Sequence, residues 1–381
     1  MVTRITNGKV LYRGEFQNMD IYLQDGKILP VGTCRSWDKT IDAQGNYVTA
    51  GFVDVHCHGG GGADFADGDY EGTVRAVQTH LRHGTTTIFP TMVSTDFDVL
   101  EKGICVVEKA QKELPSIGGI HLEGPYFSPA QTGAQNGKAL RKPDEKEYGA
   151  ILSRHKIDRW DYAPEMDEDF AFLNALLAAG TLPAAAHTDA TCQQMEDAAD
   201  RGCQLVTHLY SCTSTIRREA GFRIAGVVEA TYLRDDISAE LIADGCHLPH
   251  SLLRLAYKQK GADRLMLVTD AMRAAGLAQS GTFDIGGVPC VIEDGVAKLL
   301  DRSAFAGSIA TTDRLVRTCY QAGIPLAESV KMMTETPAKK MGLPNKGLLE
   351  EGYDADIVIF DENIHVKTVI LQGETVYEEA L

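Results

Sequence analysis

Three features of the sequence predict an α/β fold: a (β/α)8 TIM-like barrel with a small β-sandwich domain formed from both chain ends. β-rich runs alternate with helical runs from residue 48 onward, which is typical of repeated βα units. These β-rich runs number eight, as a closed barrel needs, and the Gly-x-Gly-x-x-Gly loop of an open doubly wound sheet is absent. Short alternating segments at both ends, split by hairpin signals such as Asn7-Gly8 and Asp25-Gly26, indicate antiparallel strands.

The composition is that of an ordinary globular protein. The 381 residues suffice for one large domain of ~250 residues and a smaller companion. A net charge of −16 disfavours nucleic acid and anionic membrane as partners, because both attract positive surfaces. No segment is apolar over ~18 residues and the start lacks an apolar h-region, so we expect no membrane span, no signal peptide and a cytoplasmic protein. The nine cysteines occur singly, which argues against a disulfide framework or a thiolate zinc cluster.

Two domains are expected. The small β-sandwich domain comprises residues 1–47 and 346–381, and the metal-dependent barrel comprises residues 48–345. Asp294-Gly295 marks the turn of a β-hairpin that we expect near 281–304, inserted after the eighth strand.

The barrel elements follow from hydrophobic periodicity. Runs rich in β-branched and aromatic residues predict strands at 48–56, 85–91, 117–123, 159–164, 182–187, 204–208, 239–244 and 264–270. Amphipathic stretches long enough to cover the outside of a strand pair predict helices at 70–83, 97–114, 168–179, 192–201 and 251–260, followed by 311–323 and 326–341.

The first barrel strand ends in two imidazoles. Alternate side chains of a strand share a face, so His56 and His58 point the same way and can hold one metal ion, whereas Cys57 faces away. The chemistry of (β/α)8 barrels lies at the carboxyl ends of the strands, and this pair lies at such an end. Taken alone, the pair fits equally well with surface histidines before a flexible glycine loop.

Further strands end in potential metal ligands, which are Glu123, His187, His208 and Asp270. Each alone has an ordinary structural alternative, such as a hydrogen-bonded histidine or an aspartate that caps a helix. Their joint placement on one barrel face indicates a metal centre. Four imidazoles and two carboxylates exceed one tetrahedral site and suit two divalent ions that share a carboxylate. Nitrogen-rich ligation favours Zn, Fe, Co or Ni over Mg or Ca, with Zn expected first.

The chain carries, in order, the motifs Asp54-Val-His-Cys-His-Gly, His121-Leu-Glu-Gly-Pro125, His187-Thr-Asp-Ala-Thr191, Thr207-His-Leu-Tyr210, Ala243-Asp-Gly-Cys-His247, Val268-Thr-Asp-Ala-Met272 and Ala306-Gly-Ser308. Their order and spacing resemble the N-acetylglucosamine-6-phosphate deacetylases of the amidohydrolase superfamily, nearly end to end. The resemblance implies that Glu123, His187 and His208 hold one ion. It also implies that the intact His56 and His58 permit a second ion, with Glu123 bridging the two.

The resemblance also implies a set of substrate contacts, which are Ala134, Gln135, Ser211, Cys212, Arg218, His247, Phe305, Ala306 and Gly307. The chain departs from the family pattern at Gln135, where the family usually has His, and at Ser211-Cys212-Thr213, where it has Asn-Ala-Met. Gln135 can still donate a hydrogen bond to an acetyl carbonyl, and the backbone of Ser211 and Cys212 can still face a phosphate. Arg217 and Arg218 are alternatives as the phosphate ligand; Arg218 keeps the following residues in step with the family.

The resemblance implies an enzyme, an N-acetylglucosamine-6-phosphate deacetylase. It would hydrolyse the acetamide of an N-acetylated hexosamine 6-phosphate to glucosamine 6-phosphate and acetate in amino sugar catabolism, as a homodimer with one or two divalent ions per chain. Asp270 would take a proton from water and pass it to the departing amine. The departures leave open a related amidohydrolase that acts on another N-acyl sugar, such as N-acetylgalactosamine 6-phosphate, or on an N-acyl amino acid. A non-catalytic scaffold is disfavoured because no ligand is missing.

Overall fold

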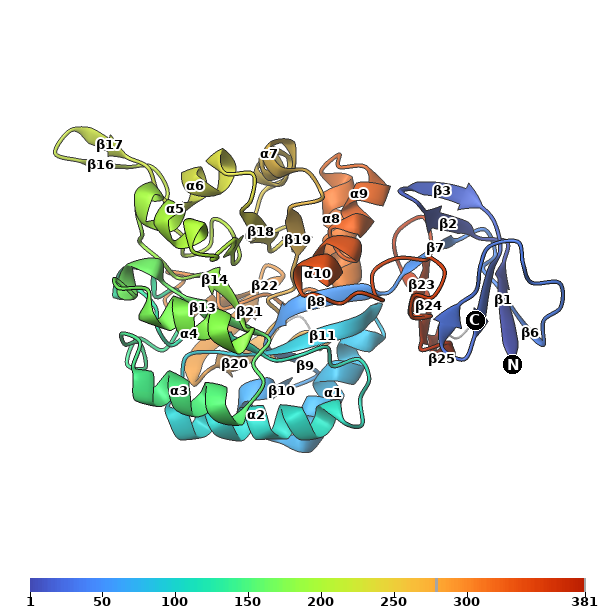
Figure 1. The fold of residues 1–381 in the computed structure, drawn as a ribbon, viewed down its shortest axis with the longest axis horizontal. Helices are drawn as coiled ribbons and strands as arrows, with labels where there is room; N and C mark the ends of the chain where they lie inside the picture. Colours follow the sequence, from blue (N-terminus) through green and yellow to red (C-terminus); the bar gives the residue numbers. More distant parts are fainter. Residues whose placement is uncertain (278–279, 380–381) are drawn as a thin grey trace.

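A parallel barrel forms the larger part of the molecule (Figure 1). The computed structural model describes residues 1–277 and 280–379. Its central sheet has eight parallel strands in chain order, β8 (Phe52–Cys57), β11 (Thr85–Met92), β12 (His121–Glu123), β13 (Arg159–Tyr162), β14 (Leu182–Ala185), β15 (Leu205–Val206), β18 (Ser238–Leu241) and β19 (Leu265–Leu267). The segment after β19 returns to β8, because the N–H of Asp270 donates to His56 O and the N–H of His58 donates to Ala271 O, both at 2.9 Å. The predicted barrel is therefore confirmed.

Helices surround the sheet, and they are α1 (Tyr70–Leu81), α2 (Phe97–Gln111), α3 (Glu145–Arg154), α4 (Ala171–Ala179), α5 (Cys192–Asp200), α6 (Val227–Leu233), α7 (His250–Lys260), α8 (Thr312–Gln321), α9 (Leu326–Lys331) and α10 (Glu335–Lys340). The short helices η1 (Phe65–Asp67), η2 (Pro129–Gln131) and η3 (Pro164–Met166) lie in loops. The prediction missed α3 and α6. No helix of the described residues is long and apolar enough to cross a membrane.

The prediction of a single helix at 326–341 is wrong, because a non-helical segment separates α9 from α10. The carbonyl of Met333 accepts from Val53 N at 2.8 Å, and the carbonyl of Met332 accepts from Leu267 N at 2.9 Å. These carbonyls satisfy backbone donors of β8 and β19 that would otherwise be buried without a partner. The tertiary contact outweighs the local helical pattern.

The run predicted as one strand at 48–56 is also divided. Its first part, β7 (Tyr47–Ala50), pairs with one strand from the C-terminal segment and one from the N-terminal segment, and its second part is barrel strand β8. Gly51 lies between them, and a Cβ there would be 2.0 Å from the hydroxyl of Thr86. Only glycine permits this close passage from one sheet to the next.

Both chain ends build the remaining β structure (Figure 1). One sheet has the order β25 (Glu374–Glu378), β24 (Val366–Leu371), β23 (Ile357–Phe360), β7, β2 (Lys9–Tyr12) and β3 (Glu15–Asn18). The other has the order β5 (Lys27–Ile28), β4 (Ile21–Gln24), β1 (Val2–Thr6) and β6 (Lys39–Asp42). Side chains of both sheets, among them Ile5, Leu23 and Ile359, form one buried cluster. Burial of each such side chain contributes about 1.5–3 kcal/mol to the free energy of unfolding.

The insertion after the barrel has three antiparallel strands instead of the predicted hairpin, which are β20 (Gly281–Ile285), β21 (Val288–Glu293) and β22 (Val296–Leu299). The predicted turn at Asp294-Gly295 is confirmed, with φ of 52° and 76°. A second turn of the same hand lies at Gly286-Gly287, with φ of 53° and 77°. That glycine pair was the missed signal for the additional strand.

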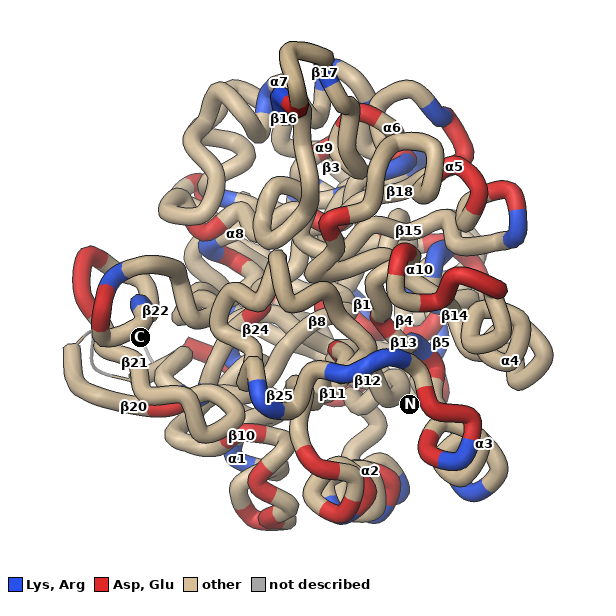
Figure 2. Tube along the Cα trace, turned by 90° about the vertical axis from the view of Figure 1, so that its left-hand side faces the viewer, with Lys and Arg blue, Asp and Glu red and all other residues tan. Residues whose placement is uncertain are grey.

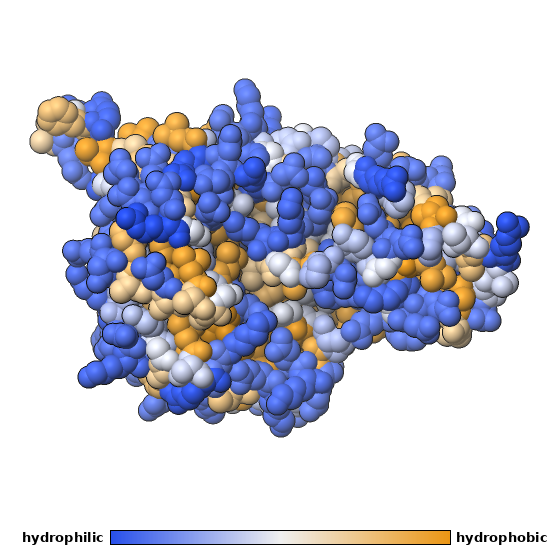
Figure 3. Space-filling model, viewed as in Figure 1, coloured by the Kyte–Doolittle hydropathy of each residue, from blue (hydrophilic) through white to orange (hydrophobic). Residues whose placement is uncertain are grey.

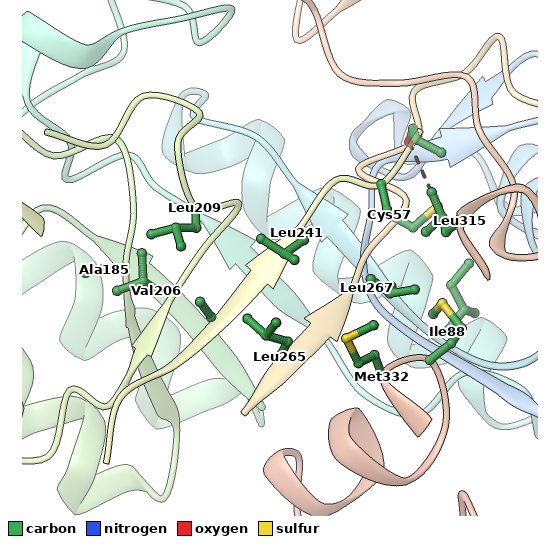
Figure 4. Close-up of a cluster of buried hydrophobic side chains, with 14 of the residues drawn as sticks. Cys57, Ile88, Ala185, Val206, Leu209, Leu241, Leu265, Leu267, Leu315 and Met332 are labelled. Atoms are coloured by element: carbon green, nitrogen blue, oxygen red, sulfur yellow. Dashed lines mark hydrogen bonds between the residues drawn. The ribbon is translucent and has the colours of Figure 1, made fainter. Parts of the chain in front are cut away.

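The main core lies between the barrel sheet and its helices. Figure 4 shows Leu241, Leu265 and Leu267 from the strands beside Leu315 and Met332 of the surrounding layer. Acidic and basic residues alternate over the outer helices, for example on α2 and α3 (Figure 2). The core positions the carboxyl ends of the strands, where the polar residues of the candidate site gather.

Candidate metal centre and active site

The predicted ligands meet at the carboxyl ends of the strands. His56 lies in β8, His58 follows it, Glu123 ends β12, and His187, His208 and Asp270 lie just beyond β14, β15 and β19. All six residues are at most 8% exposed. The Nε2 atoms of His56 and His58 are 3.2 Å apart, as strand alternation predicts. The Sγ of Cys57 faces the other way and lies 3.2 Å from His80 Nε2.

Glu123 is the centre of the group. Its Oε1 lies 3.1 Å from His187 Nε2 and 2.9 Å from His208 Nε2. Its Oε2 lies 3.3 Å from His58 Nε2, and Oε1 is 3.8 Å from His56 Nε2. Burial raises the pKa of Glu123, but the hydrogen bonds with His187, His208 and His58 outweigh it and hold this pKa well below its usual value. The carboxylate is therefore ionised and faces two pairs of imidazoles.

Asp270 is the second carboxylate that contacts His56 and His58. Its Oδ1 lies 3.1 Å from His58 Nε2 and 3.5 Å from His56 Nε2. Burial raises the pKa of Asp270, yet the hydrogen bond with His58 and the nearby imidazoles lower it overall. Asp270, His187 and His208 all have left-handed backbone, with φ of 45°, 42° and 29°. Such backbone is uncommon outside glycine and tends to occur at functional sites.

This donor set fits a pair of divalent ions. The ligand atoms of His56, His58 and Glu123 lie within 4.8 Å of one another, and so do those of Glu123, His187 and His208. Glu123 belongs to both groups. Two imidazole nitrogens only 3.2 Å apart, both facing carboxylate oxygens, suit a shared cation. Four nitrogen and two carboxylate ligands match the borderline metals Zn, Fe, Co and Ni.

A cavity of about 270 Å³ opens beside this centre. The predicted substrate contacts that line it are Ala134, Gln135, Ser211, Cys212, His247, Phe305 and Gly307. Ala306 is fully buried behind the wall, in a cluster with residues of the inserted sheet. Val93, Tyr210, Ile285 and Ala304 also line the cavity and were not predicted. Ile285 lies on β20, and no local signal could have placed that insertion beside the site.

The loop that carries Ala134 and Gln135 lies close to the ligands. Gly133 has φ of 55°, and a Cβ there would be 2.5 Å from Cys212 Sγ, so glycine is needed. Gln135 Nε2 donates to Glu123 Oε2 at 2.7 Å, and Gln135 Oε1 accepts from Ser94 N at 2.9 Å. The Ser94 N–H fixes the orientation of the amide. One N–H that we expected to face an acetyl carbonyl therefore binds Glu123.

The cavity is also lined by His247 and Phe305. Their rings are 4.8 Å apart, and His247 Nδ1 lies 2.9 Å from Asp244 Oδ2. The N–H of Ser211, predicted to face a phosphate, instead donates to His208 O at 2.8 Å. The backbone of Cys212 is left-handed, with φ of 50°. His247 is the basic side chain of the wall.

Arg218 is not part of the cavity wall within the chain. It lies on β16 (Arg217–Glu219), which pairs with β17 (Phe222–Ile224) in a hairpin that projects from the barrel (Figure 1). The hairpin carries exposed apolar side chains, Phe222 among them (Figure 3). Arg217 binds Glu219 at 2.6 Å and lies 3.5 Å from Asp189. Arg218 is exposed and forms no ion pair with the described residues, so its guanidinium is the freer of the two.

His80, behind the first strand, gives the fold a pH dependence. Burial lowers the pKa of His80 to about 4, while the unfolded chain has a value near 6.5. Between these pH values the unfolded chain binds a proton at His80 and the folded chain does not. The neutral His80 therefore contributes fully to the free energy of unfolding above pH 6.5, and this contribution is lost as pH falls towards 4. We expect His80→Gln, whose amide can donate to Gly59 O as His80 does at 2.9 Å, to be less sensitive to acid.

The measurement is urea unfolding at pH 7 and pH 5. Between pH 7 and pH 5 the free energy of unfolding of the wild type should fall by about 2 kcal/mol more than that of His80→Gln. His83→Gln is the control, because the His83 side chain is 39% exposed. Equal losses in the wild type and His80→Gln would contradict the prediction.

A barrel whose strand ends present four histidines and two carboxylates beside a cavity defines the class of metal-dependent hydrolases. The sequence profile described as "Amidohydrolase family" matches residues 47–376. The N-acetylglucosamine-6-phosphate deacetylase of Lysinibacillus sphaericus is 35% identical over 370 residues, 94% of each chain. That of Bacillus subtilis is 30% identical and covers 98% of this chain and 95% of its own. The chain therefore belongs to the amidohydrolase family, and within it to the N-acetylglucosamine-6-phosphate deacetylases.

Solved structures agree with this placement. N-acetyl-D-glucosamine-6-phosphate deacetylase from Mycobacterium smegmatis, a mutant in complex with N-acetyl-D-glucosamine-6-phosphate, has a TM-score of 0.90 and 31% identity over 99% of both chains. N-acetylglucosamine-6-phosphate deacetylase from Thermotoga maritima has a TM-score of 0.88 and 29% identity over 100% of both chains. The similarity includes the β domain as well as the barrel.

Proposed function

We propose that the chain hydrolyses the acetamide of N-acetylglucosamine 6-phosphate to glucosamine 6-phosphate and acetate, in amino sugar catabolism. The observation that carries this proposal is the convergence of Glu123, Asp270 and four histidines beside a cavity that His247 and Phe305 also line. The two relatives above bear this activity in their names, at 35% and 30% identity, and support it.

Glu123, His187 and His208 would hold one divalent ion, and His56, His58 and Asp270 a second, with Glu123 shared. When bound, such ions polarise the amide carbonyl and supply a nucleophilic water at neutral pH. Asp270 starts as the base, because its lowered pKa keeps it ionised. It accepts the proton of the attacking water and then donates it to the amine nitrogen as the C–N bond breaks.

Phosphate recognition involves His247 in this proposal, because it lines the cavity and Asp244 orients its ring. We assign Arg218 as the charged partner of the phosphate. Since its hairpin projects away from the barrel, this role requires the hairpin to fold over the cavity or to reach a second copy. We also propose that the enzyme is cytoplasmic and acts as a homodimer.

The test is acetate release from a panel of N-acetyl sugars, each with and without a 6-phosphate group. We expect N-acetylglucosamine 6-phosphate to have the highest kcat/KM. Preference for N-acetylgalactosamine 6-phosphate or for an N-acyl amino acid would favour the alternative function, a related amidohydrolase with another substrate. Gln135 and Ser211 are the departures from the family pattern that leave this alternative open. Chelated protein without added metal should release no acetate.

Arg218→Ala should raise KM for the phosphorylated sugar by ~10 to 200-fold, since a charge-assisted hydrogen bond contributes ~1.5 to 3 kcal/mol. The non-phosphorylated sugar should be nearly unaffected. Steady-state kinetics with both substrates checks this. Arg217→Ala is the matched control, because that guanidinium is already paired with Glu219. A stronger effect in the control than in Arg218→Ala would exchange the two assignments.

A further inference from the structure

Three charged residues lie inside the barrel, beneath the metal ligands. Arg159 and Asp161 are on β13, Glu240 is on β18, and each is 0% exposed. Their sequence neighbours Trp160, Ala239 and Leu241 pack in the core under the outer helices, so strand alternation directs the charged residues into the barrel. Buried charges are costly unless they are paired. Three in one place therefore call for a physical reason.

Arg159 joins the two carboxylates. Its Nη1 donates to Glu240 Oε1, and its Nε donates to Asp161 Oδ1 at 2.9 Å. Its Nη2 donates to Asp161 Oδ2 at 3.1 Å and to Thr207 Oγ1 at 2.6 Å. Because an arginine side chain stays charged in proteins, this ion pair keeps Glu240 an ionised carboxylate, which can only accept hydrogen bonds.

The second oxygen of Glu240 faces the metal centre. Glu240 Oε2 lies 3.3 Å from His56 Nδ1. Because this oxygen accepts, the proton of the neutral ring must be on Nδ1. His56 Nε2 then keeps its lone pair, and that atom faces His58 Nε2 at 3.2 Å and Asp270 Oδ1 at 3.5 Å.

The other ligand histidines lack such a partner. His187 Nδ1 faces the neutral carbonyl of Gln131 at 2.9 Å. The Nδ1 atoms of His58 and His208 have no hydrogen-bond partner among the described residues. The side chain of Glu240 approaches the His187 and His208 pair only through the backbone N–H of His208, at 3.4 Å. Its influence on the centre is thus concentrated on one ligand.

We propose that Glu240, held by Arg159, is a positioning residue that fixes the tautomer and ring orientation of His56, and that the second metal position depends on it. This inference rests on the two-ion centre of the proposed function. A carboxylate behind a ligand histidine typically changes metal affinity 10 to 100-fold when it is removed. Because Glu240 serves His56, this loss should fall on one of the two ions.

The experiment titrates zinc into chelator-treated full-length protein and measures both equivalents by competition with a chromophoric chelator. Glu240→Gln should bind one equivalent ~10 to 100-fold more weakly and leave the other unchanged. The double variant His56→Asn with His58→Asn identifies which equivalent is affected. Glu240→Asp keeps the charge beside Arg159 but withdraws the carboxylate by one methylene, so it tests the contact with His56 in a protein that retains the ion pair.

Asp161→Asn is the matched control, since Asp161 also binds Arg159 but forms no hydrogen bond with His56. Asp161 accepts from Arg159 and Thr207 and lies 3.0 Å from His121 Nε2. It should lower the melting temperature without weakening either equivalent. The inference is overturned if both Glu240 variants bind two equivalents as the wild type does, or if they weaken both alike. A wild type that binds only one equivalent while releasing acetate would instead refute the two-ion centre itself.

Discussion

Asp270→Asn should reduce kcat by ~10² to 10⁴-fold, the range that a positioned general acid and base supplies. The amide has nearly the same shape and tolerates the left-handed backbone at this position, φ 45°, so the fold should persist. It cannot take the proton of the attacking water. We therefore expect turnover to collapse while KM changes by only a few fold.

Steady-state kinetics and calorimetric binding of the substrate to the variant would separate these quantities. Asp313→Asn is a matched control, since Asp313 is 7% exposed against 8% for Asp270 and lies on α8 outside the cavity. It should retain normal turnover. Near-normal turnover of Asp270→Asn, at unchanged metal content, would show that another group moves the proton.

Gln135→Ala should lower kcat by ~10 to 1,000-fold, the span between a modest neutral donor and a full oxyanion-hole donor. The structure adds a physical reason, because the alanine would leave Glu123 Oε2 without its 2.7 Å donor and free the carboxylate to rotate. Gln135→His should keep activity within about tenfold. A neutral imidazole can accept from Ser94 N with one nitrogen and donate to Glu123 with the other.

Gln131→Ala provides the comparison in the same loop. The Gln131 side chain binds Asp189, and its contact with His187 uses only the backbone carbonyl. We expect kcat to be unchanged in that variant. An unchanged kcat in Gln135→Ala as well would remove Gln135 from the chemistry and leave it as a packing residue of the loop.

The candidate metal ligands could be recognised in the sequence because their signal is local. A histidine or carboxylate at the end of an apolar strand is recognisable in the sequence, and barrel topology then brings the strand ends together. The left-handed backbone at His187, His208 and Asp270 was not predictable in this way, since tertiary contacts impose it.

Residues whose role depends on a distant partner were missed or misplaced. Glu240 was part of a correctly predicted strand, but nothing near it in sequence reveals Arg159, 81 positions away, or His56, 184 positions away. Gln135 lines the cavity as expected, but its hydrogen bond to Glu123 was missed, because that contact depends on how the loop folds back. Ile285 lines the cavity from β20 of the inserted sheet. That sheet has one strand more than the predicted hairpin.

The pairing of β7 with β23 affects how the chain folds while it is being synthesised. Residues Tyr47–Ala50 are paired on one side by Ile357–Phe360, so that edge stays open until roughly 300 further residues have been translated. At ~5 to 20 residues per second this takes about 15 to 60 s. During that time the nascent chain exposes an apolar strand edge, which is a template for aggregation. The ribosome-bound chain should therefore depend on chaperones until its last strands emerge, however stable the finished enzyme is.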